Sequence, residues 1–191
     1  IVEFTDIAGL VAGASKGEGL GNKFLANIRE SSAIINVVRC FEDENVTHVN
    51  GRVDPLSDIE TITTELALSD LTTLEKRSVK LEKLQKSGDK KATFEYELVN
   101  KCLGSLNNFG SLNGVIFERQ EKIILTSFNL LTLKPMLFVA NVSENELTDN
   151  KHLSELKSFA SKINTPVVSI CASLESQLVD FDENEKKEFL K

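Results

Sequence analysis

Three short segments of the sequence, residues 33–40, 136–141 and 166–171, are almost continuously apolar and rich in β-branched side chains. Runs of this length and composition are typical of strands buried on both faces, as in a parallel sheet. Apolar residues at helical spacing predict a helix over residues 148–163 and another that begins near Leu20. Strands that alternate with helices predict an α/β fold with a doubly wound parallel sheet, whose ligand-binding loops follow the carboxyl ends of the strands.

The middle of the chain breaks this alternation. Residues 57–131 contain no convincing strand and no proline, and their apolar residues recur at three-, four- and seven-residue intervals. Ser87-Gly88-Asp89 predicts a turn between a long helix and a returning one, and a further helix is expected over residues 115–128. We therefore predict an antiparallel, coiled-coil-like helical hairpin, residues 57–131, inserted into an α/β domain formed by residues 1–56 and 132–191.

The charge distribution adds one candidate interaction surface. The formal net charge of −7 argues against a surface that coats nucleic acid in general, and no DNA partner is expected. Between Glu75 and Lys91, at the predicted hairpin tip, the balance reverses to seven basic against three acidic side chains. The basic residues are Lys76, Arg77, Lys80, Lys83, Lys86, Lys90 and Lys91. They form either an ordinary solvated helix face or a contact to RNA phosphates.

Other features of the sequence bear on the compartment. No stretch approaches the roughly 18 uninterrupted apolar residues of a membrane span, so no membrane partner is expected. Ile1 opens directly on an apolar pattern with no basic region before it, which argues against a signal peptide and for a chain cut inside a domain. The three cysteines are widely spaced and odd in number, which fits buried thiols in a reducing compartment. We expect a cytoplasmic protein.

The strongest local pattern is Asp6-Ile7-Ala8-Gly9, a D-x-x-G motif that ends an apolar, strand-like segment. It opens a loop that holds five of the ten glycines, from Gly9 to Gly21. In P-loop nucleotide hydrolases a carboxylate at such a strand end holds Mg²⁺, usually through water, and the glycine N–H points at the γ-phosphate. Asp6 is therefore a candidate Mg²⁺ ligand and Gly9 a candidate nucleotide-binding residue. The alternative is an aspartate that caps a turn.

Two more polar loops follow predicted strands. Asn141-Val142-Ser143-Glu144 stands where GTPases carry N-K-x-D, the motif that grips guanine, but Val142 replaces the lysine and Glu144 the aspartate. Cys171-Ala172-Ser173 follows the next strand, where GTPases carry a second base-binding loop. Adenine offers an acceptor and a donor that match the N–H and C=O of one backbone residue. We therefore predict that Val142 reads adenine through its backbone and that ATP is preferred over GTP.

The residue that positions the attacking water is not obvious from the sequence. In Ras-like enzymes a glutamine follows D-x-x-G, whereas this chain has Leu10, which has no hydrogen-bonding group. His48 lies in a loop after a predicted central strand, and an imidazole there is suited to orient water near neutral pH. His48 is therefore the candidate catalytic residue. A histidine in a surface loop is the equally weighted alternative.

The motifs together resemble the YchF family of Obg-like ATPases. The resemblance rests on segments 4–11, 13–22, 24–30, 38–43, 47–49 and 53–55, together with residues 131–135 and 139–144. It covers nearly the whole chain and is weakest from about Leu81 to Asn113.

The resemblance implies a P-loop domain with a coiled-coil insertion, a C-terminal TGS domain, Mg²⁺-dependent hydrolysis of ATP or GTP, and association with ribosomes. It also implies that Asn141 reaches the 6-amino/N7 edge of adenine. No G-x-x-x-x-G-K-[ST] occurs in the sequence, so we expect a core fragment that lacks the P-loop and the TGS domain and binds nucleotide poorly by itself. The alternatives are a nucleotide-gated ribosome- or RNA-binding module with incidental hydrolysis, and an inactive remnant.

Overall fold

The computed structural model describes residues 2–7, 20–43, 52–146, 150–179, 181–182 and 185–186. The chain divides into two compact units. The helical unit comprises Ile1–Ile34 and Glu60–Pro135, and the sheet unit comprises Ile35–Ile59 and Met136–Lys191. This division describes compactness only, and the domain boundaries expected from the sequence stay a prediction.

The elements alternate at both ends of the chain and are helical in the middle. In chain order they are α1 (Leu20–Glu30), β1 (Ile34–Arg39), α2 (Pro55–Lys86), α3 (Lys90–Phe109), α4 (Arg119–Thr126), the 3₁₀ helix η1 (Leu131–Leu133), β2 (Met136–Asn141), the 3₁₀ helix η2 (Glu144–Glu146), α5 (Lys151–Lys162), β3 (Val167–Ile170) and α6 (Ala172–Val179).

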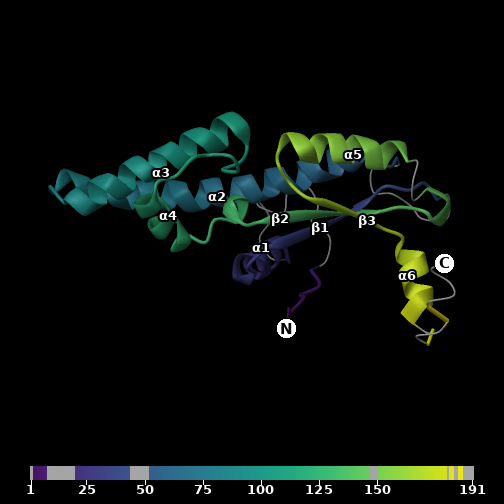
Figure 1. The fold of residues 1–191 in the computed structure, drawn as a ribbon. Helices are drawn as coiled ribbons and strands as arrows, with labels where there is room; N and C mark the ends of the chain where they lie inside the picture. The colour runs from purple at the N-terminus through teal and green to yellow at the C-terminus, as the bar shows by residue number, and fades with distance from the viewer. Residues whose placement is uncertain are drawn as a thin grey trace. The chain divides into compact units, whose positions relative to one another are not determined.

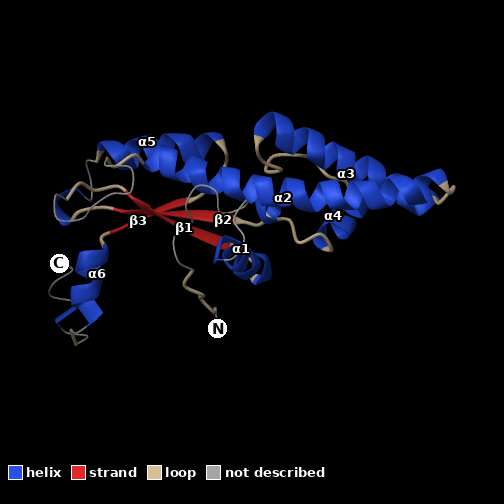
Figure 2. Cartoon of the chain, turned by 180° about the vertical axis from the view of Figure 1, so that it is seen from behind, coloured by secondary structure: helices blue, strands red, loops and turns tan. Residues whose placement is uncertain are grey.

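The sheet unit contains a three-stranded sheet in the order β1-β2-β3. Strands β2 and β3 run parallel, with Phe138 opposite Val167 and Asn141 opposite Ile170. At the far end of β1, the Cys40 N–H donates to the Asn141 carbonyl over 2.8 Å. Figure 2 shows the three strands side by side, with α5 along one face. The prediction of an α/β fold with a parallel sheet is confirmed, and so are its three strands.

The core of the sheet unit lies between the strands and α5. Its buried members include Val38, Phe138, Ala140, Leu153 and Leu156. The helix buries a stripe because its apolar residues recur every three or four positions along one face.

The prediction that the strands are buried on both faces is wrong for β1 and β3. Ile35 and Val37 of β1 are 44% and 63% exposed, and Val168 of β3 is 48% exposed. Successive strand residues point to opposite faces, and these side chains point away from the face that α5 covers.

The helical unit is built on the antiparallel pair of α2 and α3 (Figure 1). Gly88 makes the turn with a φ of 87°, a conformation that costs a glycine nothing. Asp89 then caps α3, because its side chain accepts hydrogen bonds from the Lys91 and Ala92 N–H groups. Gly110, with a φ of 66°, ends α3. The predicted long helix, turn and returning helix are confirmed.

Helix α4 completes the core of the helical unit. Leu125 of α4 and Phe128 pack in one buried cluster with Leu74 of α2 and Val99 of α3. The helix is shorter than the predicted range of residues 115–128, because Glu118 caps it and its N–H donates to Glu121 over 2.7 Å.

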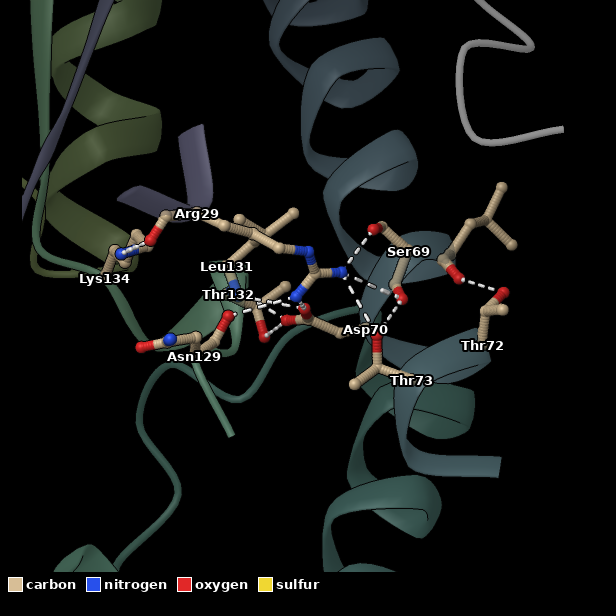
Figure 3. A network of polar contacts seen from close by, with 10 residues as sticks. Arg29, Ser69, Asp70, Thr72, Thr73, Asn129, Leu131, Thr132 and Lys134 are labelled. Atoms are coloured by element: carbon tan, nitrogen blue, oxygen red, sulfur yellow. Dashed lines mark hydrogen bonds and ion pairs between the residues drawn. The ribbon is translucent and has the colours of Figure 1, made fainter. Parts of the chain in front are cut away.

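A polar network around Asp70 fixes the end of α1 within the helical unit (Figure 3). The Asp70 side chain is fully buried and accepts hydrogen bonds from the Leu131 and Thr132 N–H groups over 2.9 and 2.8 Å. Arg29 of α1 reaches toward it and donates to Ser69 Oγ over 2.7 Å. Burial raises the pKa of Asp70, against the lowering effect of these backbone hydrogen bonds and of the Arg29 charge.

The segment before α1 differs from its prediction. Residues 2–7 were expected to form a strand that ends at Asp6, but they have no regular secondary structure. Val2 and Phe4 are 78% and 75% exposed. An alternating pattern becomes a strand only when a neighbouring strand pairs with it, and the described sheet consists of β1, β2 and β3 alone. The predicted strand is therefore wrong.

Cys40, Cys102 and Cys171 are all free and buried, as expected. Burial raises the pKa of Cys40 to about 11, so its thiol stays protonated at neutral pH. No helix in the described ranges is long and apolar enough to cross a bilayer.

Candidate functional site

The candidate site lies at the carboxyl ends of β2 and β3. The register places Asn141, the last residue of β2, opposite Ile170, the last residue of β3. The polar loops that follow the two strands therefore start beside each other, as expected for parallel strands.

A hydrogen bond joins these two loops. The Ala172 N–H donates to Asn141 Oδ1 over 3.1 Å. Because a backbone N–H can only donate, the amide oxygen of Asn141 must face it, and the amide NH₂ remains as a donor. Ala172 is the first residue of α6, whose opening N–H groups have no acceptor within the helix. Asn141 thus supplies one of those acceptors and keeps a donor for a ligand.

Val142 is tied into the sheet. Its N–H donates to the Ile170 carbonyl over 2.9 Å, and the residue is 2% exposed. Its N–H is therefore already used. A contact between Val142 and a base stays a prediction. Because the Val142 N–H is engaged, the group that donates a hydrogen bond to the base must be another group of the loop.

The loop after Val142 turns through η2. Glu144 begins η2 and is exposed, whereas Glu146 ends it and is partly buried. Ser143 Oγ donates to Glu146 Oε2 over 2.8 Å. This contact closes the loop on itself between the end of β2 and the end of η2.

The loop after β3 is anchored at its start. Cys171 is buried, and its Sγ lies 3.1 Å from the hydroxyl oxygen of Ser173, which is exposed. The Cys171 carbonyl accepts a hydrogen bond from the Glu175 N–H over 3.0 Å in the first turn of α6. The three predicted residues Cys171, Ala172 and Ser173 therefore form the entry to that helix.

The other predicted site residues are placed only in part. Gly9 and His48 lie outside the described residues. Asp6 lies in the irregular segment 2–7 and is exposed. The described ranges hold no group of three or more His, Cys, Asp or Glu side chains that would bind a metal. Mg²⁺ bound to a nucleotide is commonly held by one or two carboxylates and the phosphates, so a lone Asp6 suits that chemistry. Its role stays a prediction.

The basic hairpin tip contains one residue that is engaged in packing. The Arg77 guanidinium lies 3.8 Å from the centre of the Phe128 ring and 3.5 Å from Glu95 Oε2. Lys86 donates to Glu82 over 2.7 Å at the helix surface. Lys76, Lys80, Lys83, Lys90 and Lys91 are exposed. We therefore restrict the candidate RNA contact to the lysines.

Sequence reasoning missed two residues behind the site, Glu146 and Asn150. Asn150 is 5% exposed and precedes α5, where its side chain accepts from the Leu153 N–H over 2.8 Å. In the sequence, Asn150 stands directly before the apolar pattern that predicts α5, and this position is typical of a helix cap. Its contact with the Cys40 carbonyl spans 110 residues and carries no local signal.

Curated relatives match the chain over almost its whole length. It is 51% identical over 189 residues to the ribosome-binding ATPase YchF of Haemophilus influenzae, covering 99% of this chain and 52% of that protein. It is 47% identical over 191 residues to the protein of the same name from Bacillus subtilis, covering 98% of this chain and 52% of that protein. The chain thus spans about half the length of the curated relatives it matches.

A solved structure has the same fold. The Schizosaccharomyces pombe YchF GTPase structure aligns with a TM-score of 0.78 at 30% identity, over 92% of this chain and 50% of that one. The names of these proteins thus differ in the nucleotide, ATP in the bacterial relatives and GTP in the Schizosaccharomyces pombe structure. A comparison with protein-family models gives no match.

Proposed function

The chain belongs to the YchF family, and from this premise we propose that it carries the base-binding loops of a ribosome-associated nucleoside triphosphatase. The bacterial relatives are named ribosome-binding ATPases, which supports both the reaction and the partner. The substrate is ATP or GTP, hydrolysed with Mg²⁺ in the full-length protein.

The hydrogen bond between Asn141 and Ala172 carries this proposal. It holds the two loops together and leaves the Asn141 NH₂ as a donor for a ligand. Purine N7 is an acceptor in both adenine and guanine, so this donor selects a purine. Cys171 and Ser173 flank the base beside Ala172.

The preference between ATP and GTP depends on the loop after Asn141. The positions of Val142 and Glu144 depart from N-K-x-D, which removes the usual grip on guanine. The Val142 N–H is engaged by the Ile170 carbonyl, so of the Val142 backbone only the carbonyl serves the base, accepting from the adenine 6-amino group, and the donor to adenine N1 is another group of the loop. The proposed substrate is therefore ATP in preference to GTP.

The phosphate end of the site is assigned from the sequence motif. Asp6 is the residue that would hold Mg²⁺, and the Gly9 N–H would contact the γ-phosphate. His48 orients the attacking water. Mg²⁺ supplies charge neutralisation at the phosphates when it is bound.

A second candidate function is a ribosome-binding module in which hydrolysis is incidental. The six exposed lysines of the hairpin tip favour it, because they carry positive charge on an otherwise acidic chain. In this reading the hairpin binds ribosomal RNA phosphates, and the nucleotide sets the affinity.

Single-turnover hydrolysis of ATP and GTP by the full-length protein, with and without ribosomes, tests these proposals. An ATPase coupled to the ribosome hydrolyses ATP faster when ribosomes are present. A binding module associates with ribosomes in a nucleotide-dependent way at an unchanged, slow rate of hydrolysis. A protein that neither binds nucleotide nor associates with ribosomes is an inactive remnant, and both proposals fail.

A further inference from the structure

Glu146 connects the loop after β2 to the segment that precedes α5. One of its carboxylate oxygens, Oε2, accepts two hydrogen bonds, from Ser143 Oγ over 2.8 Å and from Asn150 Nδ2 over 3.1 Å. Both donors lie in the sheet unit. The loop is thus closed by this side chain in addition to the backbone hydrogen bond that the Glu146 N–H donates to the Ser143 carbonyl over 3.1 Å.

Asn150 anchors this contact to the rest of the sheet unit. Its Nδ2 also donates to the Cys40 carbonyl, just beyond the end of β1, over 2.6 Å, while its Oδ1 accepts from the Leu153 N–H. The backbone partners fix the amide orientation, because Cys40 offers only an oxygen and Leu153 only an N–H. Glu146 is therefore held by a side chain that is 5% exposed and has no alternative orientation.

The chain of contacts runs from the end of β1 to the loop that follows Asn141. Cys40, Asn150, Glu146 and Ser143 are linked in that order. A loop held in this way loses little further conformational freedom when a base binds. Loosening it lowers affinity without removing any atom that contacts the base.

We propose that Glu146 is a positioning residue for the nucleotide base, acting through Ser143 on the loop from Val142 to Glu144. This inference rests on the proposed function, because it concerns the same base-binding loops. The hydrogen-bond partners of Glu146 are Ser143 in the loop and Asn150 behind it. Because Glu146 acts on the loop that is assigned to the base, we expect it to affect binding of the base and not binding of the phosphates.

Two substitutions at Glu146 distinguish positioning from a general effect of charge. Both hydrogen bonds enter one oxygen, so the amide oxygen of Glu146→Gln can accept both of them, whereas Glu146→Ala removes both. Neither change touches the cap of α5, which Asn150 makes with its other atom. Glu155→Ala, an exposed glutamate on α5, is the matched control for loss of a negative charge.

The experiment measures the affinity of the full-length protein for ATP and, separately, for inorganic tripolyphosphate. Glu146→Ala is expected to weaken ATP binding about fivefold, the equivalent of one net hydrogen bond, and to leave tripolyphosphate binding unchanged. Glu146→Gln and Glu155→Ala are expected to stay within about twofold of the wild type for both ligands.

Ser143→Ala provides a second measurement that does not depend on the stability of the Glu146 variants. It removes the loop side of the same bond, so it is expected to weaken ATP binding as Glu146→Ala does, and the double variant is expected to be no weaker than either. Wild-type ATP affinity in Ser143→Ala or Glu146→Ala, or equal losses for ATP and tripolyphosphate, overturns the inference. A wild-type protein that binds no ATP overturns the proposed function as well.

Discussion

Arg29 Nη1 lies 3.9 Å from the carboxylate of Asp70, which is completely buried between the end of α1, α2 and η1. The arginine also donates to the Asn129 carbonyl over 3.1 Å and to Thr73 Oγ1 over 3.1 Å. Lys134 adds hydrogen bonds to the carbonyls of Arg29 and Ser31. The end of α1 is therefore fixed by charged groups and not by apolar packing alone.

The first prediction concerns this buried carboxylate. Asp70→Asn places an NH₂ group among the N–H donors of Leu131 and Thr132 and leaves Arg29 without its counter-charge. We expect the free energy of unfolding to fall by about 3 kcal/mol, as for other broken buried pairs. Urea denaturation measures it. Glu82→Gln, which breaks the surface pair with Lys86, is the control and should leave stability unchanged. Equal effects of the two variants would contradict this assignment.

The second prediction is a pH dependence at Glu121. The Glu118 N–H and then the Lys101 ammonium hold the pKa of Glu121 below its ordinary value. A lowered folded-state pKa contributes stability above about pH 4.3, and this is lost as the pH falls through the folded-state pKa. The wild type is therefore more stable than Glu121→Gln at pH 7, and the difference shrinks as the pH falls below about 4.3. A difference that is constant from pH 7 to pH 3 would rule this out.

The third prediction concerns the hairpin tip. Reversing the charge of Lys83, Lys90 and Lys91 is expected to lower ribosome affinity at least about tenfold and to reduce its salt dependence, because fewer counterions are released. Intrinsic hydrolysis is expected to stay unchanged. Lys86 is left in place because it already bonds to Glu82.

The control for the hairpin tip carries the same change in charge elsewhere. Lys122, Lys157 and Lys162 are exposed lysines outside the tip, and reversing them should leave co-sedimentation with ribosomes unaffected. If both triple variants weaken association equally, the effect is one of net charge, and the tip is an ordinary solvated helix face.

The fourth prediction concerns catalysis. His48→Ala in the full-length protein is expected to lower kcat about tenfold or more with nearly unchanged nucleotide affinity, the pattern of a group that acts in the transition state. His152→Ala is the control, since His152 lies on α5 with its Nε2 3.7 Å from Glu42 and has no assigned catalytic role. Single-turnover hydrolysis measures both. An unaltered kcat in His48→Ala removes this residue from the mechanism.

The fifth prediction concerns the choice of base. Glu144 is exposed at the start of η2, at the position where N-K-x-D has aspartate. Glu144→Asp restores the carboxylate position that accepts from guanine N1–H and the 2-amino group, so the ratio of GTP to ATP affinity is expected to rise. Competition binding with both nucleotides measures this ratio. A ratio equal to that of the wild type would show that Glu144 has no part in base selection.

Local sequence patterns determined the strands, the helices and the hairpin turn. The spacing of apolar residues and the types of side chain are properties of short stretches of sequence. Therefore β1, β2, β3, α5 and the turn at Gly88 could be predicted without any long-range information. The polar loops after β2 and β3 were predictable for the same reason, because parallel strands bring their carboxyl ends to one edge.

Tertiary structure alone decided which polar groups are paired. Ala172 bonds to Asn141 across 31 residues, and Asn150 bonds to Cys40 across 110. Arg29 pairs with Asp70 across about 40 residues, and no local pattern encodes such pairs. It also decided that residues 2–7 are not a strand, since a strand requires hydrogen bonds to a neighbouring chain segment. Tertiary structure decided, third, that the Val142 N–H is engaged in a hydrogen bond. Only the register of β2 on β3 places the Ile170 carbonyl against this N–H.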